Sequence, residues 1–202
     1  MNYTFIPTSI EKLTIMNEPA NMQVVEDSLV VRSHPSTDFW LKTHYGFEVM
    51  NGHVLHASIA ADFNAEVSLH MRPAATYDQA GLFIMVSDTC WLKTSLEYIP
   101  DGPSHLGAVV TNHGYSDWST QNYANSLVME PLAFRVERNA SDYTIFTKTP
   151  TNPNEWEQIR IAHLHEDPGT NPVKVGIYCC SPMQDSDGFD THFHTFTINE
   201  TA

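Results

Sequence analysis

Three side chains that could bind a ligand lie close together in one strand-like segment of the chain. Trp91, Lys93 and Glu97 are separated by two and four residues, and because successive side chains of a β-strand point to opposite faces, all three share one face. An indole can stack on the C–H face of a sugar, while an ammonium and a carboxyl group can fix its hydroxyls. The spacing therefore predicts a ligand-binding row. The alternative is a satisfied polar network that stiffens the sheet.

The row belongs to residues 78–98, whose pattern predicts a β-hairpin with two chemically different faces. Aliphatic residues alternate with polar or aromatic residues in both arms. A loop of three residues, 88–90, keeps the aliphatic side chains of both arms on one face, whereas a two-residue loop would separate them. We therefore expect the three-residue loop, which places Gly81 opposite Glu97 and leaves space beside that carboxyl group.

Two neighbouring segments are expected to add polar groups to the same face. Gln79 lies in the first arm of the hairpin and points the same way as the row. If the strand expected at 65–72 pairs with that arm, His70 and Arg72 point in this direction as well. The sequence thus predicts a pocket that combines an indole, cations, a carboxyl group and an amide.

The longest interruption of the strand pattern is residues 112–127. Because strand alternation is absent there, the segment predicts a long loop that carries Asp117 and Trp118 over the sheet, as binding loops on rigid sandwiches often do. Alternatively, its aromatic residues simply pin a long connection to the surface.

Short alternating runs separated by turn residues recur along the chain, and helical periodicity is nearly absent. Strands of this number and spacing predict an all-β sandwich of two antiparallel sheets. No linker or internal repeat divides the 202 residues, so we expect a single domain over 1–202. The expected strands are 13–18, 22–26, 28–33, 39–42, 53–60, 65–72, 79–87, 91–99, 107–112, 132–138, 143–148, 156–163, 174–180 and 194–198.

The net charge of the chain limits the classes of molecule that it is expected to bind. The formal net charge is −14, from 24 acidic and 10 basic residues. Such a field repels phosphate backbones and anionic lipid headgroups, so we expect neither nucleic acid nor a membrane as partner. A neutral carbohydrate or a metabolic-enzyme partner is compatible with it.

The cysteines and the first residues indicate a cytoplasmic protein. Cys90, Cys179 and Cys180 are odd in number and form no CxxC motif, so reduced thiols are expected. Neighbouring residues of a strand face opposite ways, which makes Cys179 and Cys180 small core residues. The chain starts without a basic segment followed by an apolar run, so no signal peptide is expected.

Two histidine pairs have a spacing that could bind a metal ion. His163 and His165 precede Glu166, and His192 and His194 show the same spacing. Histidines at i and i+2 share a strand face and can chelate, but Glu166 follows at once, where jelly-roll metal motifs place the acid several residues later. We therefore expect no metal. No phosphate-binding glycine loop, nucleophile elbow or dinucleotide fingerprint occurs, so we expect no cofactor.

Several blocks, in this order, resemble one known family. They are YDQAGLFIMVSDTCWLKTSLEY, AVVTNHGYSDWST and VGIYCCSP, followed by a closing F-x-x-F-x-I pattern. Over about residues 35–198 the chain is similar to the regulation-of-enolase protein family, a family of unknown function. The resemblance implies a concanavalin A-like jelly roll of two curved sheets, and a role in carbohydrate metabolism. The residues of this chain that match the family's motifs are Asp78, Gln79, Gly81, Trp91, Lys93, Glu97, Ser116, Asp117, Trp118 and Pro182.

These observations predict a non-catalytic regulatory or binding protein linked to carbohydrate metabolism, with a pocket on the concave face for a sugar or a protein partner. The alternative is a glycan-acting enzyme. Glycoside hydrolysis needs two carboxyl groups about 5–10 Å apart, and Glu97 with Asp117 is the candidate pair. Trp91 and Lys93 stand where glucanases of this fold usually carry partner acids, so the binding protein is the preferred hypothesis and no catalytic residue is assigned to it.

Overall fold

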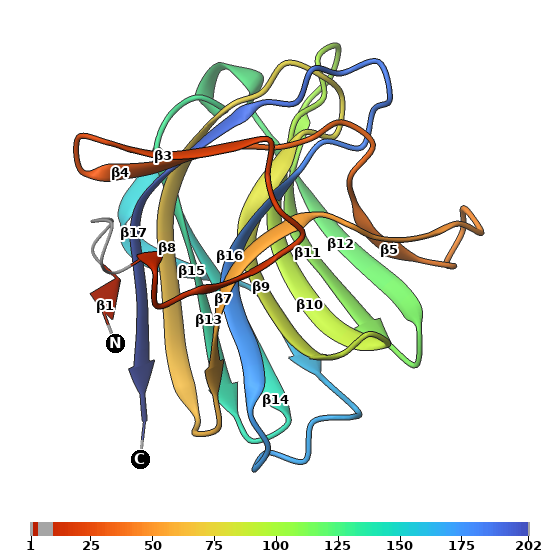
Figure 1. The fold of residues 1–202 in the computed structure, drawn as a ribbon, viewed down its shortest axis with the longest axis vertical. Helices are drawn as coiled ribbons and strands as arrows, with labels where there is room; N and C mark the ends of the chain where they lie inside the picture. Colours follow the sequence, from red (N-terminus) through yellow and green to blue (C-terminus); the bar gives the residue numbers. More distant parts are fainter. Residues whose placement is uncertain (1, 4–9, 202) are drawn as a thin grey trace.

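The computed structural model describes residues 2–3 and 10–201, which form two large antiparallel sheets packed face to face (Figure 1). Regular structure in these residues is almost entirely β, apart from a short 3-10 helix, η1 (Asn125–Leu127). The all-β sandwich predicted from the alternating pattern is therefore confirmed. None of the helices in the described part is long and apolar enough to cross a membrane.

The first sheet, called sheet A, has eight strands. Its long central strands come from distant parts of the chain, so the sheet joins the two halves of the sequence. In spatial order they are β15 (Asn152–His163), β14 (Asp142–Thr149), β13 (Leu132–Asn139), β8 (Phe63–Arg72), β17 (Asp190–Glu200), β4 (Ser28–Arg32) and β3 (Asn21–Val25), with β1 (Asn2–Tyr3) also pairing with β17.

The second sheet, called sheet B, has seven strands, and a separate two-stranded hairpin accompanies it. The hairpin consists of β5 (Phe39–Leu41) and β6 (Glu48–Met50) and projects beside sheet B in Figure 1. In spatial order the strands of sheet B are β12 (Tyr115–Tyr123), β11 (Ser104–Asn112), β10 (Cys90–Glu97), β9 (Gln79–Ser87), β16 (Val173–Cys180), β7 (His53–Ile59) and β2 (Thr14–Met16).

The main core lies between the inner faces of the two sheets. Strand β8 shows how it is built, because every second residue of Phe63–Met71 is fully buried and the residues between them are partly exposed. In β10 the inner face is Leu92 and Leu96, which join the same apolar cluster. Full burial of an aliphatic side chain contributes about 1.5–3 kcal/mol, so this alternation fixes which residues of each strand face outward.

A second apolar cluster covers part of the outer face of sheet B. Phe39 of the β5–β6 hairpin packs against Phe83 and Trp91, with ring centroids 4.4 Å and 6.1 Å away. The hairpin thereby covers part of the outward face of β9 and β10. The buried members of the cluster are Phe39, Trp40, Leu41, Val54, Phe83, Met85, Trp91, Val109, Tyr178 and Cys180.

The three cysteines are free and buried, as the sequence predicts. Cys179 belongs to the cluster between the sheets, whereas Cys180 belongs to the outer cluster. Their opposite orientation along β16 is therefore confirmed.

Each strand expected from the sequence overlaps an observed one, but the loop predicted over 112–127 is wrong. Most of it is strand β12, which pairs with β11 along its whole length after a tight turn at His113 and Gly114. Both turn residues have positive φ, at 52° and 75°. Because β12 is an edge strand with little apolar cover, its sequence lacks the alternation that marks central strands.

The expected three-residue loop of the β9–β10 hairpin is also wrong. Asp88 and Thr89 alone separate the two strands, and Cys90 pairs with Ser87. A β-bulge between Cys90 and Trp91 then shifts the register by one residue. The two-residue turn alone would place the aliphatic side chains of the two strands on opposite faces, and the bulge returns them to the same face. The predicted faces are therefore correct, although the predicted cross-strand partners are not.

A buried ion pair ties the connection between β15 and β16 to β13. The Arg138 guanidinium donates two hydrogen bonds to the Asp167 carboxylate, at 2.6 and 2.9 Å, and both side chains are fully buried. The hydroxyl of Tyr143 donates to the same carboxylate. Burial alone would raise the pKa of Asp167, but the bonds from Arg138 and Tyr143 outweigh it and lower that pKa.

Asp167→Ala should destabilise the fold by about 3–5 kcal/mol, because it leaves the Arg138 charge buried without its counter-charge. Urea unfolding near neutral pH measures this change. The matched control is Asp142→Ala, which removes an exposed carboxylate paired with His163 and should cost about 0–1 kcal/mol. Equal effects of the two substitutions would contradict a structural role for the Arg138–Asp167 pair.

Candidate functional site

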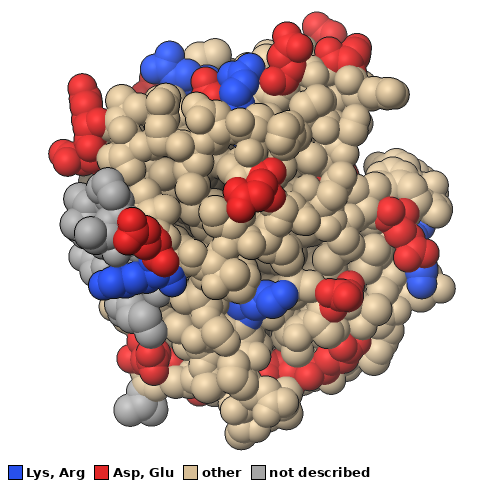
Figure 2. All heavy atoms as spheres, viewed as in Figure 1, with Lys and Arg blue, Asp and Glu red and all other residues tan. Residues whose placement is uncertain are grey.

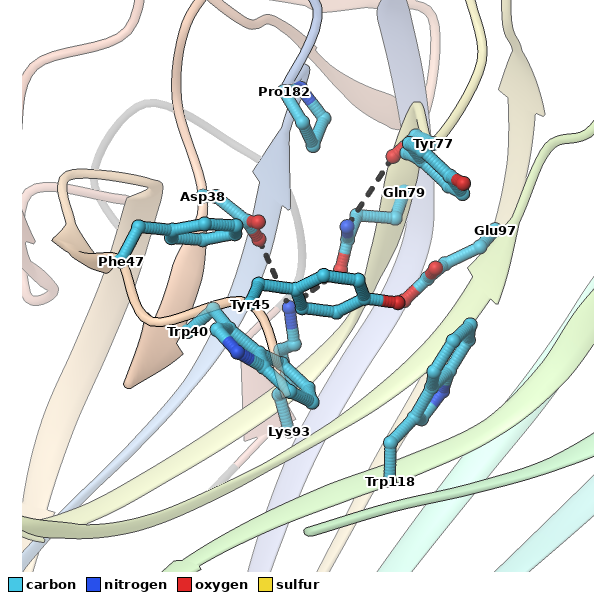
Figure 3. A pocket seen from close by; sticks show the side chains of 10 residues that line it. All are labelled: Asp38, Trp40, Tyr45, Phe47, Tyr77, Gln79, Lys93, Glu97, Trp118 and Pro182. Carbon is cyan, nitrogen blue, oxygen red and sulfur yellow. Dashed lines mark hydrogen bonds and ion pairs between the residues drawn. The ribbon is translucent and has the colours of Figure 1, made fainter. Parts of the chain in front are cut away.

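A cavity of about 320 Å³ lies on the outer face of sheet B, between the β5–β6 hairpin and strands β9, β10 and β12 (Figure 3). Its volume falls at the lower end of the range of about 300–1,000 Å³ found for small-molecule sites. Half of its lining is aromatic and several polar groups project into it. The lining residues are Asp38, Trp40, Tyr45, Phe47, Tyr77, Gln79, Lys93, Glu97, Trp118 and Pro182.

Lys93 forms the floor of the cavity and is almost completely buried. Its ammonium donates hydrogen bonds to Asp38 Oδ1 at 3.2 Å and to Gln79 Oε1 at 2.7 Å; both are drawn in Figure 3. Burial acts to lower the pKa of Lys93, but the acidic groups around the ammonium, with the carboxylate of Asp38 foremost, together outweigh it and the pKa is raised. Lys93 therefore stays charged, and its ion pair with Asp38 holds the start of the β5–β6 hairpin against β10.

Gln79 is held in one orientation by its neighbours. Its amide oxygen accepts hydrogen bonds from Lys93 and from the hydroxyl of Tyr178, at 2.7 and 3.2 Å. Its amide nitrogen donates to the backbone carbonyl of Tyr77 at 3.2 Å. Because these bonds fix the side chain before a ligand arrives, little ordering entropy is lost on binding.

Glu97 has fewer partners than Lys93. Its carboxyl group accepts a long hydrogen bond from the Ser95 hydroxyl, at 3.3 Å, and it forms no ion pair within the described residues. Burial raises the pKa of Glu97 to about 7, partly offset by the charge of Lys93. Near neutral pH this group can therefore donate a hydrogen bond when protonated or accept hydrogen bonds when ionised.

Aromatic rings form the walls of the cavity. Trp40, Tyr45 and Phe47 come from the β5–β6 hairpin, Trp118 comes from β12, and Tyr77 precedes β9. Tyr45 and Phe47 stack at a centroid distance of 5.7 Å, and Trp40 meets Tyr45 edge to face at 5.5 Å. Such rings offer flat apolar surfaces next to the polar floor.

The turn of the hairpin is shaped so that these rings reach the cavity. Lys42, His44 and Gly46 have positive φ, and the backbone N–H of Lys42 donates to the carbonyl of Phe47 at 2.9 Å, which closes the turn. The indole nitrogen of Trp40 donates to the carbonyl of Thr43 at 2.9 Å. The aromatic wall is thus built from local backbone bonds as well as from packing.

Gly81 allows strands β9 and β10 to approach each other closely beside the polar side chains of the cavity. The hydroxyl of Thr94 accepts a hydrogen bond from the backbone N–H of Leu82 at 2.9 Å. A Cβ on Gly81 would lie 2.2 Å from the Thr94 carbonyl oxygen, so any larger residue would push β9 away from β10. Gly81 does not lie opposite Glu97, as the sequence predicted, because Glu97 pairs with Gln79.

The structure brings Gln79, Lys93, Glu97 and Trp118 of the predicted set together in the cavity. Trp91 shares their face but does not line the cavity, because its side chain is fully buried against Phe39 and Phe83. The indole that the sequence predicted as the stacking surface is therefore part of the floor beneath the site.

His70 and Arg72 lie elsewhere, and the expected pairing of their strand with β9 is wrong. Strand β8 pairs with β13 and β17 in sheet A. There His70 stacks on the ring of His192, with centroids 4.4 Å apart. The sequence could not show this, because strand pairing across long separations leaves no trace in local alternation.

Trp118 and Asp117 leave β12 on opposite faces. Lys93 pairs with Val109, and Val109 pairs with Trp118, so Trp118 faces the cavity. Asp117 turns to the other face, where its carboxylate accepts a hydrogen bond from Arg160 at 2.6 Å.

The candidate catalytic pair of Glu97 and Asp117 is therefore not brought together. The carboxylate that shares the cavity with Glu97 is Asp38. Because Asp38 is bonded to the ammonium of Lys93, it is poorly placed to act as a free base or nucleophile.

Sequence reasoning missed most of the cavity lining from the β5–β6 hairpin and the residues near it. The stretch 38–47 contains four aromatic residues around Gly46, which is a signal of a protruding aromatic turn. Asp38 and Lys93 are 55 residues apart in the chain, so no local sequence pattern indicates their contact. The missed lining residues are Asp38, Trp40, Tyr45, Phe47 and Tyr77, whereas Pro182 ends the VGIYCCSP block that carries the family resemblance.

No group of three or more His, Cys, Asp or Glu side chains in the part of the chain that the structure describes could hold a metal ion. The two histidine pairs make other contacts. His194 shares a hydrogen bond of 2.8 Å with His70, and the ring of His163 bonds the carboxylate of Asp142 at 2.7 Å.

Comparison with known proteins bears out the resemblance noted in the sequence. A family described as "Protein of unknown function (DUF1349)" matches residues 15–201. "Regulation of enolase protein 1" of Saccharomyces cerevisiae is 31% identical over 175 residues, covering 87% of this chain and 84% of the yeast protein. The crystal structure of a functionally unknown S. cerevisiae protein superposes with a TM-score of 0.83 at 27% identity, covering 96% of this chain and 98% of the other.

More distant structures share the fold. A lectin from Bauhinia forficata in complex with GalNAc gives a TM-score of 0.62 at 14% identity, covering 100% of this chain and 97% of the lectin. Xylan beta-1,4-xylosidase from Bacillus halodurans gives 0.63 at 12% identity, covering 86% of this chain but 33% of the enzyme. These matches confirm the predicted lectin-like sandwich.

The raised pKa of Glu97 gives stability a specific pH dependence. Folding raises that pKa from 4.5 to about 7, so the folded protein keeps a proton that the unfolded chain has already lost. The free energy of unfolding therefore falls as the pH rises through this interval. Glu97→Gln cannot ionise, so its stability relative to the wild type should rise by a few kcal/mol between about pH 5 and about pH 8.

Urea unfolding of both proteins across this pH range measures the effect. Glu157→Gln on the exposed side of β15 is the control, and its stability difference from the wild type should not vary with pH. A constant difference for Glu97→Gln would show that the Glu97 carboxyl group is not desolvated.

Proposed function

The chain belongs to the DUF1349 family, and we propose that it is a non-catalytic protein that binds a neutral carbohydrate in the cavity on the outer face of sheet B. One observation carries the proposal: aromatic walls and fixed polar groups meet in a single preformed cavity. Sugar sites need both, because C–H faces stack on rings while hydroxyls require hydrogen-bond partners.

The charges of the cavity favour a neutral ligand. The ammonium of Lys93 is matched by the carboxylate of Asp38, and the pKa of Glu97 of about 7 leaves that group partly protonated near neutral pH. The net charge of −14 disfavours anionic ligands, and Asp and Glu side chains are spread around the face shown in Figure 2. A hydroxylated neutral molecule fits these conditions better than a phosphate.

The relatives support a link to carbohydrate metabolism. The yeast relative is named a regulation of enolase protein, and the distant structural neighbours include a lectin bound to GalNAc and an enzyme named for xylan. A regulator that senses a sugar through this cavity and acts on a metabolic enzyme in the cytoplasm is consistent with the three free thiols.

Binding is preferred to glycoside hydrolysis for a geometric reason. Hydrolysis requires two carboxyl groups that flank the scissile bond with distinct roles. Asp117 is turned away toward Arg160, and Asp38 is engaged by Lys93. Glu97 therefore has no unengaged carboxylate as its partner among the residues that line the cavity.

Trp118→Ala should weaken sugar binding about tenfold or more, because it removes a ring from the cavity wall. Calorimetric titration with xylose, glucose, galactose and GalNAc measures the affinities. Trp156→Ala is the matched control, since Trp156 packs on Arg135 in sheet A and its loss should leave binding unchanged. Wild-type protein that binds no sugar in this panel or its oligomers would refute the proposed function.

Trp91→Ala should act on stability instead. The side chain is fully buried in the outer apolar cluster, and truncation of a buried tryptophan costs about 3–5 kcal/mol. Thermal unfolding should show a large drop in melting temperature. A variant that melts like the wild type but has lost sugar binding would place Trp91 in the site and contradict its packing against Phe39 and Phe83.

A further inference from the structure

A second hollow borders the first cavity. It has a volume of about 550 Å³ and shares Trp40, Tyr45 and Trp118 with the first. Since the same three rings wall both spaces, a ligand bound in one lies next to the other. The residues that line the second hollow in addition are Thr43, His44, Tyr115, Ser116 and Asp117.

From this arrangement we propose that the ligand is a neutral oligosaccharide that spans two subsites, the second formed between the β5–β6 hairpin and β12. The inference rests on the proposed function and specifies its ligand class. The first sugar unit occupies the cavity of Gln79, Lys93 and Glu97, and the next unit lies against Tyr45 and Tyr115.

The distribution of exposed aromatic rings supports this assignment. Large apolar side chains on a protein surface are normally scattered singly. Here all the exposed large aromatic side chains of the described residues border the two hollows. They are Tyr45, Phe47, Tyr77 and Tyr115, with exposed fractions of 55%, 44%, 41% and 61%. The aromatic surface thus continues past the first cavity as far as Tyr115.

The walls of the second hollow are tied to each other. The hydroxyl of Ser116 on β12 accepts a hydrogen bond from the backbone N–H of Leu41 on β5, at 2.9 Å. It also bonds the hydroxyl of Thr111 at 2.8 Å, and the ammonium of Lys42 lies 5.4 Å from the centroid of the Tyr115 ring. The hollow is therefore preformed, which reduces the entropy lost when a ligand binds.

The chemistry of the second hollow suits another sugar unit. Tyr45 and Tyr115 provide apolar faces, while Thr43 and His44 provide hydrogen-bonding groups at the same opening. The carboxylate of Asp117 turns to the other face of β12, where it pairs with Arg160, so it does not make this part of the groove select for a charged ligand. A repeating neutral molecule with one apolar face in each unit matches both hollows.

A chain-length series tests the inference. Calorimetric titrations of the wild type with xylose through xylotetraose and with glucose through cellotetraose and maltotetraose give affinities as a function of length. Binding should strengthen about tenfold or more from the monosaccharide to the disaccharide or trisaccharide of the recognised series. Tyr115→Ala should remove this gain while its affinity for the monosaccharide stays within about twofold of the wild type.

Two further variants sharpen the test. Tyr115→Phe retains the ring and should retain the gain with chain length, and Trp156→Ala in sheet A should behave like the wild type. Equal affinity for monosaccharides and oligosaccharides, or equal weakening of both by Tyr115→Ala, would overturn the second subsite and leave the proposed function intact. Absence of binding to every sugar in the series and to galactose, GalNAc and their oligomers would overturn the proposed function itself.

Discussion

The site depends on the need of a buried ammonium group for a counter-charge. Lys93 is almost completely buried, and its ammonium pairs with the carboxylate of Asp38, 55 residues earlier in the chain. An unpaired charge in such a place would cost several kcal/mol, so the contact holds the start of the β5–β6 hairpin against β10. The same ammonium orients Gln79. One interaction therefore places both the polar floor and the base of the aromatic wall.

The outer face of sheet B serves two purposes. On one side of the polar row the β5–β6 hairpin buries Phe83 and Trp91 in a small second core. Beyond this core the hairpin turn projects Tyr45 and Phe47 over open space rather than onto the sheet. A rigid base with exposed rings above it is what a binding site requires, because packing fixes the geometry while the rings keep free faces.

The sequence predicted the strands well because apolar alternation is a local property. Even the error in the β9–β10 turn left the faces correct, since the bulge at Cys90 and Trp91 restored the parity that the core demands. Where alternation was absent the prediction failed. Strand β12 was taken for a loop, because an edge strand can satisfy its backbone without burying every second side chain.

The sequence by itself determined the all-β class, the family and the shared face of Lys93 and Glu97, because these follow from local periodicity and motif order. Tertiary structure decided which residues join that face. It brought in Asp38 and the hairpin aromatics, buried Trp91, turned Asp117 toward Arg160 and placed His70 and Arg72 in sheet A. The physical reason is that strand pairing and hairpin packing depend on contacts between segments far apart in the chain, which alternation within one strand does not encode.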